Sequence, residues 1–142
     1  MTHGQGQVSP GALAKPPERV LLIRPSALGD VCRTVPLLAS LRRFAPSARI
    51  DWLVQDTFAD AVRHHPALTG VIEFPRKRFG NMLSPAVMRE VWSWLGNLRS
   101  NRYDWVIDAQ GLARSGLFTR WSGAPVRVGP RSAAEFAWLA YN

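Results

Sequence analysis

Short apolar runs alternate with segments of helical spacing along most of this 142-residue chain. Val20–Ile23 is continuously apolar, which is typical of a strand buried on both faces of a sheet. Apolar positions at helical spacing follow between Val31 and Ala45. Because Pro36 falls inside this stretch, we expect a kink there or a helix whose regular part starts later.

The same alternation continues to the end of the chain. Four more strands are predicted, at 49–54, 71–74, 105–107 and 126–128. Helices are predicted at 57–64, 85–99, 111–121 and 132–142, and Ser84 is the expected N-cap of the second. This pattern predicts an α/β fold with a parallel sheet that helices cover on both faces.

Residues 1–18 are rich in glycine and proline and carry little to bury, so we predict a flexible tail before an ordered region at 19–142. No apolar run approaches the roughly 20 residues that cross a bilayer. The N-terminus also lacks the pattern of a secretory signal. Because Cys32 is the single cysteine, no disulfide forms within the chain. We therefore expect a cytoplasmic protein.

Eighteen lysines and arginines against ten aspartates and glutamates give a formal net charge of +8. All of the basic residues except Lys15 and Lys77 are arginine, which binds phosphate and carboxylate through paired hydrogen bonds. The excess favours a polyanionic partner: nucleic acid, an anionic membrane surface or an anionic substrate. Nucleic acid ranks last, because the arginines are scattered and no recognised nucleic-acid motif occurs.

Ligands of parallel α/β sheets bind beyond the carboxyl ends of the strands, which here means loops 24–30 and 108–111. The first loop ends in Gly29 and Asp30 at a predicted helix start. Gly29 is expected to allow a tight turn or the close approach of a ligand. Asp30 is either the N-cap of the helix or a general base that takes a proton from a substrate hydroxyl. One glycine is too few for a dinucleotide fingerprint, and the loop is not a P-loop.

The second loop contains Asp108, Gln110 and Gly111. Asp108 is expected either to accept hydrogen bonds from backbone amides or to contact a ligand. Gln110 can orient a sugar hydroxyl, because its amide both donates and accepts. Arg114 lies one turn into the following helix, near the same edge of the sheet.

The densest basic cluster, Pro75–Phe79, follows the third predicted strand. It is either a solvated loop or an anion site at the ligand-binding edge. His64 and His65 have no acidic or cysteine partner at ligand spacing, so no metal site is expected.

Three segments and one terminal pair resemble the bacterial ADP-heptose:lipopolysaccharide heptosyltransferases, which are family 9 glycosyltransferases. They are Arg19–Asp30, Arg49–Val54, Val106–Leu112 and Tyr141-Asn142. The resemblance covers residues 19–142 in order and is strongest to the heptosyltransferase I type. It implies a Rossmann-like doubly wound sheet, the acceptor-binding N-terminal domain of a two-domain GT-B enzyme.

The resemblance also implies an inverting transfer of heptose from ADP-heptose to the Kdo and lipid A inner core in lipopolysaccharide biosynthesis, with no cofactor and no essential metal. The donor would bind a C-terminal domain that is absent here, so we expect a truncated half that does not turn over alone. The anionic lipopolysaccharide acceptor would account for the excess arginine without nucleic acid. Peripheral contact with the inner face of the cytoplasmic membrane is a further expectation.

By the same resemblance, Asp30 matches the catalytic base of the family. A carboxylate at this position can accept a hydroxyl proton while the new C–O bond forms. The other matched residues are expected to bind the acceptor: Arg24, Ser26, Gly29, Lys77, Arg78, Gln110, Gly111 and Arg114. The alternative is a non-catalytic Rossmann-like module that binds a phosphorylated or nucleotide ligand.

Overall fold

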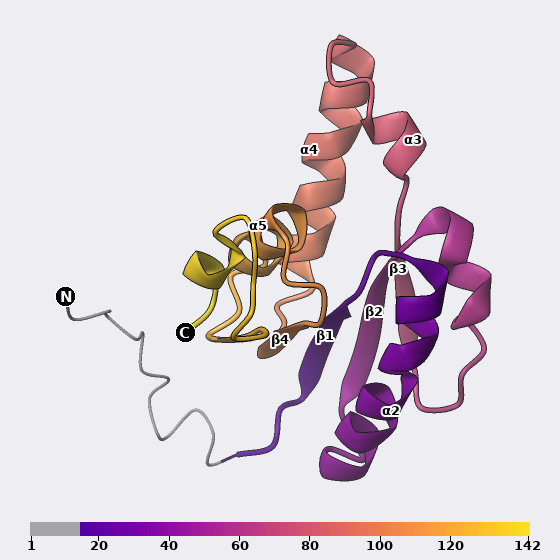
Figure 1. The fold of residues 1–142 in the computed structure, drawn as a ribbon, viewed down its shortest axis with the longest axis vertical. Coiled ribbons are helices and arrows are strands. Elements are labelled where there is room, and N and C mark those ends of the chain that lie inside the picture. Colours follow the sequence, from indigo (N-terminus) through magenta and orange to yellow (C-terminus); the bar gives the residue numbers. More distant parts are fainter. Residues whose placement is uncertain (1–14) are drawn as a thin grey trace, which may run out of the picture.

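A computed structural model describes residues 15–142. A five-stranded sheet in the order β3-β2-β1-β4-β5 forms its centre (Figure 1). The strands are β1 (Arg19–Ile23), β2 (Arg49–Gln55), β3 (Gly70–Phe74), β4 (Trp105–Asp108) and β5 (Val126–Val128). Every neighbouring pair is parallel, which confirms the predicted α/β class. The predicted tail lies outside the described residues except for positions 15–18.

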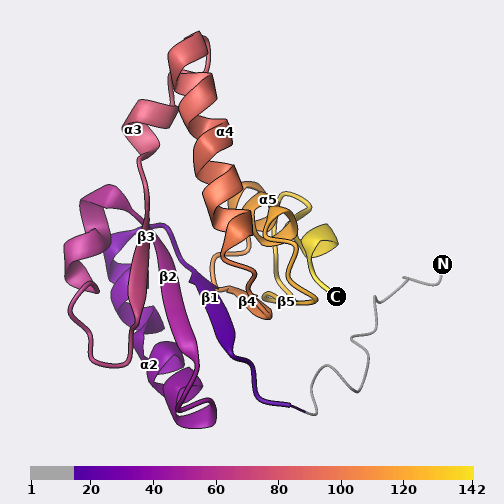
Figure 2. The ribbon, with the colours of Figure 1, turned by 180° about the vertical axis from the view of Figure 1, so that it is seen from behind.

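Helices cover both faces of the sheet, as expected for a Rossmann-like doubly wound fold (Figures 1 and 2). The long ones are α2 (Leu28–Phe44) on one face and α4 (Pro85–Ser100) and α5 (Ala113–Trp121) on the other. The short ones are η1 (Asp56–Ala61), α3 (Arg76–Phe79) and η2 (Ala137–Ala140).

The sheet divides the apolar core into two clusters, because successive strand residues point to opposite faces. Leu22 of β1 belongs to the cluster that contains Leu38 of α2. Its neighbour Leu21 belongs to the other cluster, with Leu98 of α4 and Phe118 of α5. Both leucines are fully buried, so the continuous apolar run in β1 is explained by burial on both faces.

The structure contradicts the expectation of a later start for α2 and the expectation that Asp30 caps it. The helix begins at Leu28, and Pro36 lies inside it rather than delaying it. Proline removes the partner of the carbonyl four residues earlier, here that of Cys32. Because Cys32 and Pro36 are both exposed, that carbonyl can turn to water. The N-cap is Ala27, which makes Asp30 the third helical residue and not the cap.

Four other features also differ from expectation. The predicted helix 57–64 is the 3-10 helix η1, and the basic cluster after β3 forms the short helix α3 instead of a loop. Ser84 occupies the N-cap position of α4, but its side chain makes no capping hydrogen bond. The last segment contains only η2, because Glu135 and Phe136 have φ of 53° and 64°, which interrupt a right-handed helix.

The strand order determines where a ligand can bind. From β1 the chain proceeds to β2 and β3 on one side, and then crosses to β4 and β5 on the other. The direction therefore reverses between β1 and β4. In open parallel sheets, ligands bind at the carboxyl ends of the strands where the order reverses.

Candidate active site

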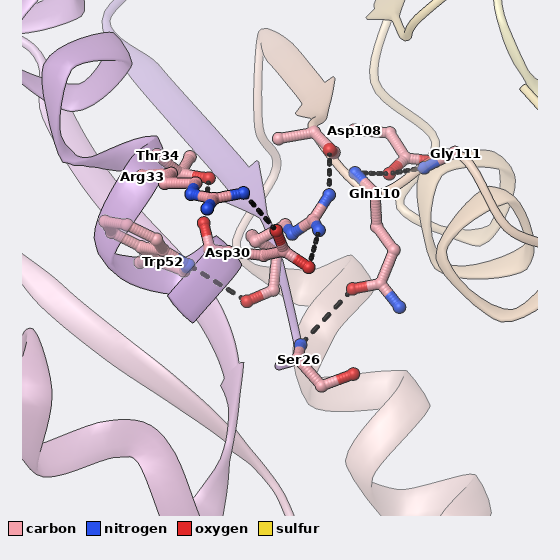
Figure 3. A network of polar contacts seen from close by, with 10 residues as sticks. Ser26, Asp30, Arg33, Thr34, Trp52, Asp108, Gln110 and Gly111 are labelled. Atoms are coloured by element: carbon pink, nitrogen blue, oxygen red, sulfur yellow. Dashed lines mark hydrogen bonds and ion pairs between the residues drawn. The ribbon is translucent and has the colours of Figure 1, made fainter. Parts of the chain in front are cut away.

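The loops that follow β1 and β4 are hydrogen-bonded to each other at this switch point (Figure 3). Nη1 of Arg24 donates to the backbone oxygen of Ala109 at 2.6 Å. The backbone nitrogen of Ser26 donates to Oε1 of Gln110 at 3.2 Å. The fold thus joins the two loops that the sequence singles out into one site.

Asp30 lies in the first turn of α2 and faces the loop after β1. Its Oδ2 is 2.8 Å from Nη2 of Arg24, and its Oδ1 is 3.9 Å from Nη1 of Arg33. No backbone amide of the described residues donates to the carboxylate, and 45% of the side chain is exposed. The capping interpretation of Asp30 is therefore wrong. The carboxylate has one firm partner and stays open to a ligand.

Arg24 is enclosed by the protein on several sides. Its backbone oxygen accepts a hydrogen bond from Nε1 of Trp52 at 3.3 Å, while its guanidinium contacts Ala109 and Asp30. Only 17% of the side chain is exposed, and Nε is buried without a partner in the described part of the chain. These contacts make Arg24 a support for the Asp30 carboxylate, whereas the resemblance predicts contact with the acceptor.

Gly29 does not form a tight turn. It is the second residue of α2 and does not have a positive φ. A Cβ built at this position meets nothing within 4 Å. The expectation of a special backbone conformation is therefore wrong. Because Gly29 has no side chain, it leaves open space beside Asp30.

Asp108 organises the second loop from a buried position. Its Oδ1 accepts hydrogen bonds from the backbone nitrogens of Gln110 and Gly111 at 2.9 and 3.0 Å. Its Oδ2 accepts from the hydroxyls of Ser115 at 2.9 Å and Tyr141 at 2.6 Å. With four donors on a buried carboxylate, Asp108 shapes the loop and is not free to bind a ligand. Burial and this hydrogen bond raise the pKa of Tyr141, which keeps its hydroxyl a donor.

The glycine of this loop is required by packing. Gly111 has φ of +72°, which glycine adopts without strain. A Cβ on it would lie 2.6 Å from Cγ of Pro130. If Gly111 contacts an acceptor as predicted, it does so through its backbone.

The three basic residues that were predicted to bind the acceptor outside loop 24–30 lie in different environments. Arg78 forms a two-pronged ion pair with Glu90, which raises the pKa of Arg78 and lowers that of Glu90. Lys77 is exposed and makes no ion pair with another described residue. The Arg114 guanidinium lies 5.4 Å from the ring centre of Phe74, at the end of β3. Arg114 and the basic cluster thus meet near the same end of the sheet.

A cavity of about 360 Å³ opens beside Arg114. Its floor is apolar, and Arg76 and Arg114 supply its positive charge. The remaining lining residues come from β3, the α3–α4 region and α5: Phe74, Phe79, Gly80, Met82, Val91, Trp94, Leu95, Leu117 and Phe118. Such a cavity suits an anionic group attached to an apolar body.

Neither a metal cluster nor a membrane-spanning helix is found in residues 15–142. No three His, Cys, Asp or Glu side chains among these residues are placed to hold a metal ion. No helix in this range has the length and apolar character needed to cross a bilayer.

Comparisons with known proteins identify a family and several similar proteins. Residues 91–142 match the family model for glycosyltransferase family 9 (heptosyltransferase). Lipopolysaccharide heptosyltransferase 1 of Pseudomonas aeruginosa is 39% identical over 106 residues, which are 74% of this chain and 30% of that protein. The Escherichia coli K12 protein of the same name is 36% identical over 104 residues, 72% of this chain and 33% of that protein.

A solved structure extends the similarity to three dimensions. E. coli heptosyltransferase WaaC with ADP-2-deoxy-2-fluoro heptose superposes with a TM-score of 0.78 at 34% identity. The match covers 87% of this chain and 41% of WaaC. The chain is homologous to the heptosyltransferases of glycosyltransferase family 9. It spans about a third of the length of the curated heptosyltransferases that it matches.

Two arginines near Asp30 and the cavity were not singled out from the sequence, although Arg76 belongs to the basic cluster Pro75–Phe79. Arg33 lies within 3.9 Å of Asp30, and spacing of three residues on a helix could have identified this neighbour. Arg76 lines the cavity with Arg114, whereas the resemblance points to its neighbours Lys77 and Arg78. No sequence signal distinguishes Arg76 from these neighbours, because the short helix α3 decides which way each one faces.

Proposed function

We propose that this chain is the acceptor-binding part of an inverting heptosyltransferase, with ADP-heptose as donor and the anionic inner core of lipopolysaccharide as acceptor. The half-exposed carboxylate of Asp30, at the switch point of the sheet and supported by Arg24, is the observation that carries the proposal. The similarity to heptosyltransferases of P. aeruginosa and E. coli supports it.

In the proposed reaction, Asp30 accepts the proton of an acceptor hydroxyl. The hydroxyl oxygen forms a bond to the anomeric carbon of heptose as the bond from that carbon to the ADP oxygen breaks. ADP leaves with the electron pair, and its charge requires stabilising donors. We assign these donors to the part of the relatives that this chain does not match, so we expect no transfer by this chain alone.

Acceptor binding is proposed for the residues that border Asp30 and the cavity. Nε2 of Gln110 has no hydrogen-bond partner among the described residues and can donate to a sugar hydroxyl. Lys77 and Arg114 supply positive charge for the phosphates or carboxylates of the acceptor. Ser26 and Gly29 line the approach to Asp30. We further propose that residues 19–142 form this acceptor-binding domain.

Calorimetry on the chain itself tests the proposal. We expect binding of a soluble, deacylated Kdo–lipid A head group and little binding of ADP. Lys77→Gln with Arg114→Gln should weaken head-group binding by about tenfold or more, since each change removes a charge-assisted contact. Arg43→Gln with Arg131→Gln, which removes two charges at exposed positions away from the cavity, is the matched control. Tighter binding of ADP than of the head group would instead favour a nucleotide-binding module.

A further inference from the structure

The connection between α3 and α4 forms a projecting tip. In both ribbon views, α3 and the start of α4 extend beyond the rest of the fold along its longest axis (Figures 1 and 2). At this tip, 96% of Leu83 and 47% of Met82 are exposed. Two adjacent apolar side chains are thus exposed to solvent in the projecting connection between α3 and α4.

Unpaired positive charge surrounds these two side chains. Between Pro75 and Glu90 the chain has four basic residues and one acid. The acid, Glu90, forms an ion pair with Arg78. The three other basic residues are exposed and form no ion pair with any residue in 15–142: Arg76, Lys77 and Arg89.

We propose that this tip, defined as Arg76–Arg89, is a docking surface for an anionic lipid bilayer. Leu83 and Met82 enter the interfacial region, and Arg76 and Arg89 bind the phosphates of the membrane lipids, while Lys77 remains assigned to the acceptor. Single exposed leucines are common on proteins. Here, however, apolar exposure, projection and uncompensated positive charge coincide, and this combination is typical of interfacial membrane attachment.

The position of the tip fits the proposed function, on which this inference partly rests. Met82 and Arg76 also line the cavity beside Arg114. Docking of the tip would therefore place the mouth of that cavity close to the headgroups. A glycolipid acceptor could then reach the carboxyl edge of the sheet without leaving the membrane.

Vesicle co-sedimentation of the 142-residue chain tests the surface. We expect binding to phosphatidylcholine vesicles that contain phosphatidylglycerol, weak binding to phosphatidylcholine alone, and affinity that falls with added salt. Leu83→Asp should weaken binding by about tenfold or more, the scale of burying one leucine. Leu139→Asp, at a site that is 63% exposed in η2, should bind as the wild type does.

Two double variants, each lacking two positive charges, test the contribution of charge to vesicle binding. Arg76→Gln with Arg89→Gln should lower the affinity for anionic vesicles by about fivefold for each residue. Arg43→Gln with Arg131→Gln changes the same number of exposed charges elsewhere and should leave the affinity within about twofold. An equal loss in both pairs would overturn the assignment of the tip, because only net charge would then matter.

Insertion can be observed directly. Leu83→Cys in a Cys32→Ser background carries one environment-sensitive fluorophore, since Cys32 is the single native cysteine. We expect a blue shift with anionic vesicles, and none for a label at Leu139→Cys. An unshifted label at position 83, or wild-type binding by Leu83→Asp, would overturn the proposal. For Leu83→Asp, loss of vesicle binding with intact calorimetric binding of the Kdo–lipid A head group supports the membrane surface. For the wild type, vesicle binding without binding of that head group would contradict only the proposed function.

Discussion

Nη2 of Arg24 lies 2.8 Å from Oδ2 of Asp30, and this ion pair joins the end of β1 to the first turn of α2. The two partners differ in exposure. Arg24 is held by Ala109 and Trp52 and is mostly buried, while nearly half of Asp30 is exposed. A fixed cation behind an accessible carboxylate is suited to orient that carboxylate toward a ligand.

Removal of Arg24 should impair transfer more than binding. Activity is measured in a chimera in which this chain replaces the matching part of E. coli WaaC. Arg24→Met should lower kcat by roughly 100-fold, because the base loses its orientation. Arg24→Lys should recover part of this loss by keeping a cation beside Asp30. A raised KM with unchanged kcat would instead make Arg24 an acceptor-binding residue.

Gly29→Ala should change the stability of the fold and its affinity for the acceptor head group in opposite directions. Residue 29 is helical and a Cβ meets no atom, so alanine should raise the free energy of unfolding by about 0.5–1 kcal/mol. Head-group affinity should fall, because the methyl group occupies the space beside Asp30. Gly96→Ala in α4 also meets no atom within 4 Å and is the matched control. It should give the same stabilisation with unchanged affinity, as measured by chemical denaturation and calorimetry.

Tyr141→Phe tests the role of the C-terminal segment in shaping the second loop. The change removes one of the two hydroxyl donors to the buried Asp108. Leaving a buried carboxylate short of a partner should cost about 1–3 kcal/mol of stability. Denaturant unfolding measures this cost. A loss below about 0.5 kcal/mol would show that water or another donor replaces the hydroxyl.

The raised pKa of Tyr103 should make the free energy of unfolding fall at alkaline pH. Burial, followed by its hydrogen bond to the buried Asp51, raises the pKa of Tyr103 above its ordinary value of 10.0. The folded state therefore keeps a proton that the unfolded state loses. The free energy of unfolding should be insensitive to this group below pH 10.0 and should fall above it, by up to about 1.4 kcal/mol per pH unit.

Tyr103→Phe should flatten this alkaline decline. The chain has two tyrosines, and the raised pKa of Tyr141 contributes a slope of the same sign. Unfolding curves across alkaline pH for the single and double phenylalanine variants separate the two contributions. An unchanged slope in the double variant would mean that other groups cause the decline.

The sheet could be predicted from the sequence because burial on two faces leaves a clear pattern. Val20–Ile23 is apolar at every position, and the structure buries every one of these side chains. Periodicity also located α4, whose observed bounds differ by one residue from the expected ones. Loops 24–30 and 108–111 could be placed at the ligand-binding edge because both follow strands of a parallel sheet. The order of the strands, which makes these two loops neighbours, was not predicted and comes from the structure.

Details set by tertiary contacts could not be predicted in the same way. The sequence does not reveal that Asp108 gathers four donors, because Tyr141 reaches it from 33 residues away. The position of Asp30 depended on where α2 begins, and a start at Leu28 moved it from the cap into the first turn. The pairing of Arg78 with Glu90 likewise depends on α3 folding back against α4.

Asp30→Asn in the WaaC chimera shows whether Asp30 accepts the proton of the acceptor hydroxyl. The amide keeps the size of the side chain and its exposed position but cannot act as a base. We expect a loss in kcat of about 10²- to 10⁴-fold, with folding and head-group affinity near those of the parent chimera. A kcat within about twofold of the parent would contradict it, since the carboxylate would then contribute nothing to proton transfer.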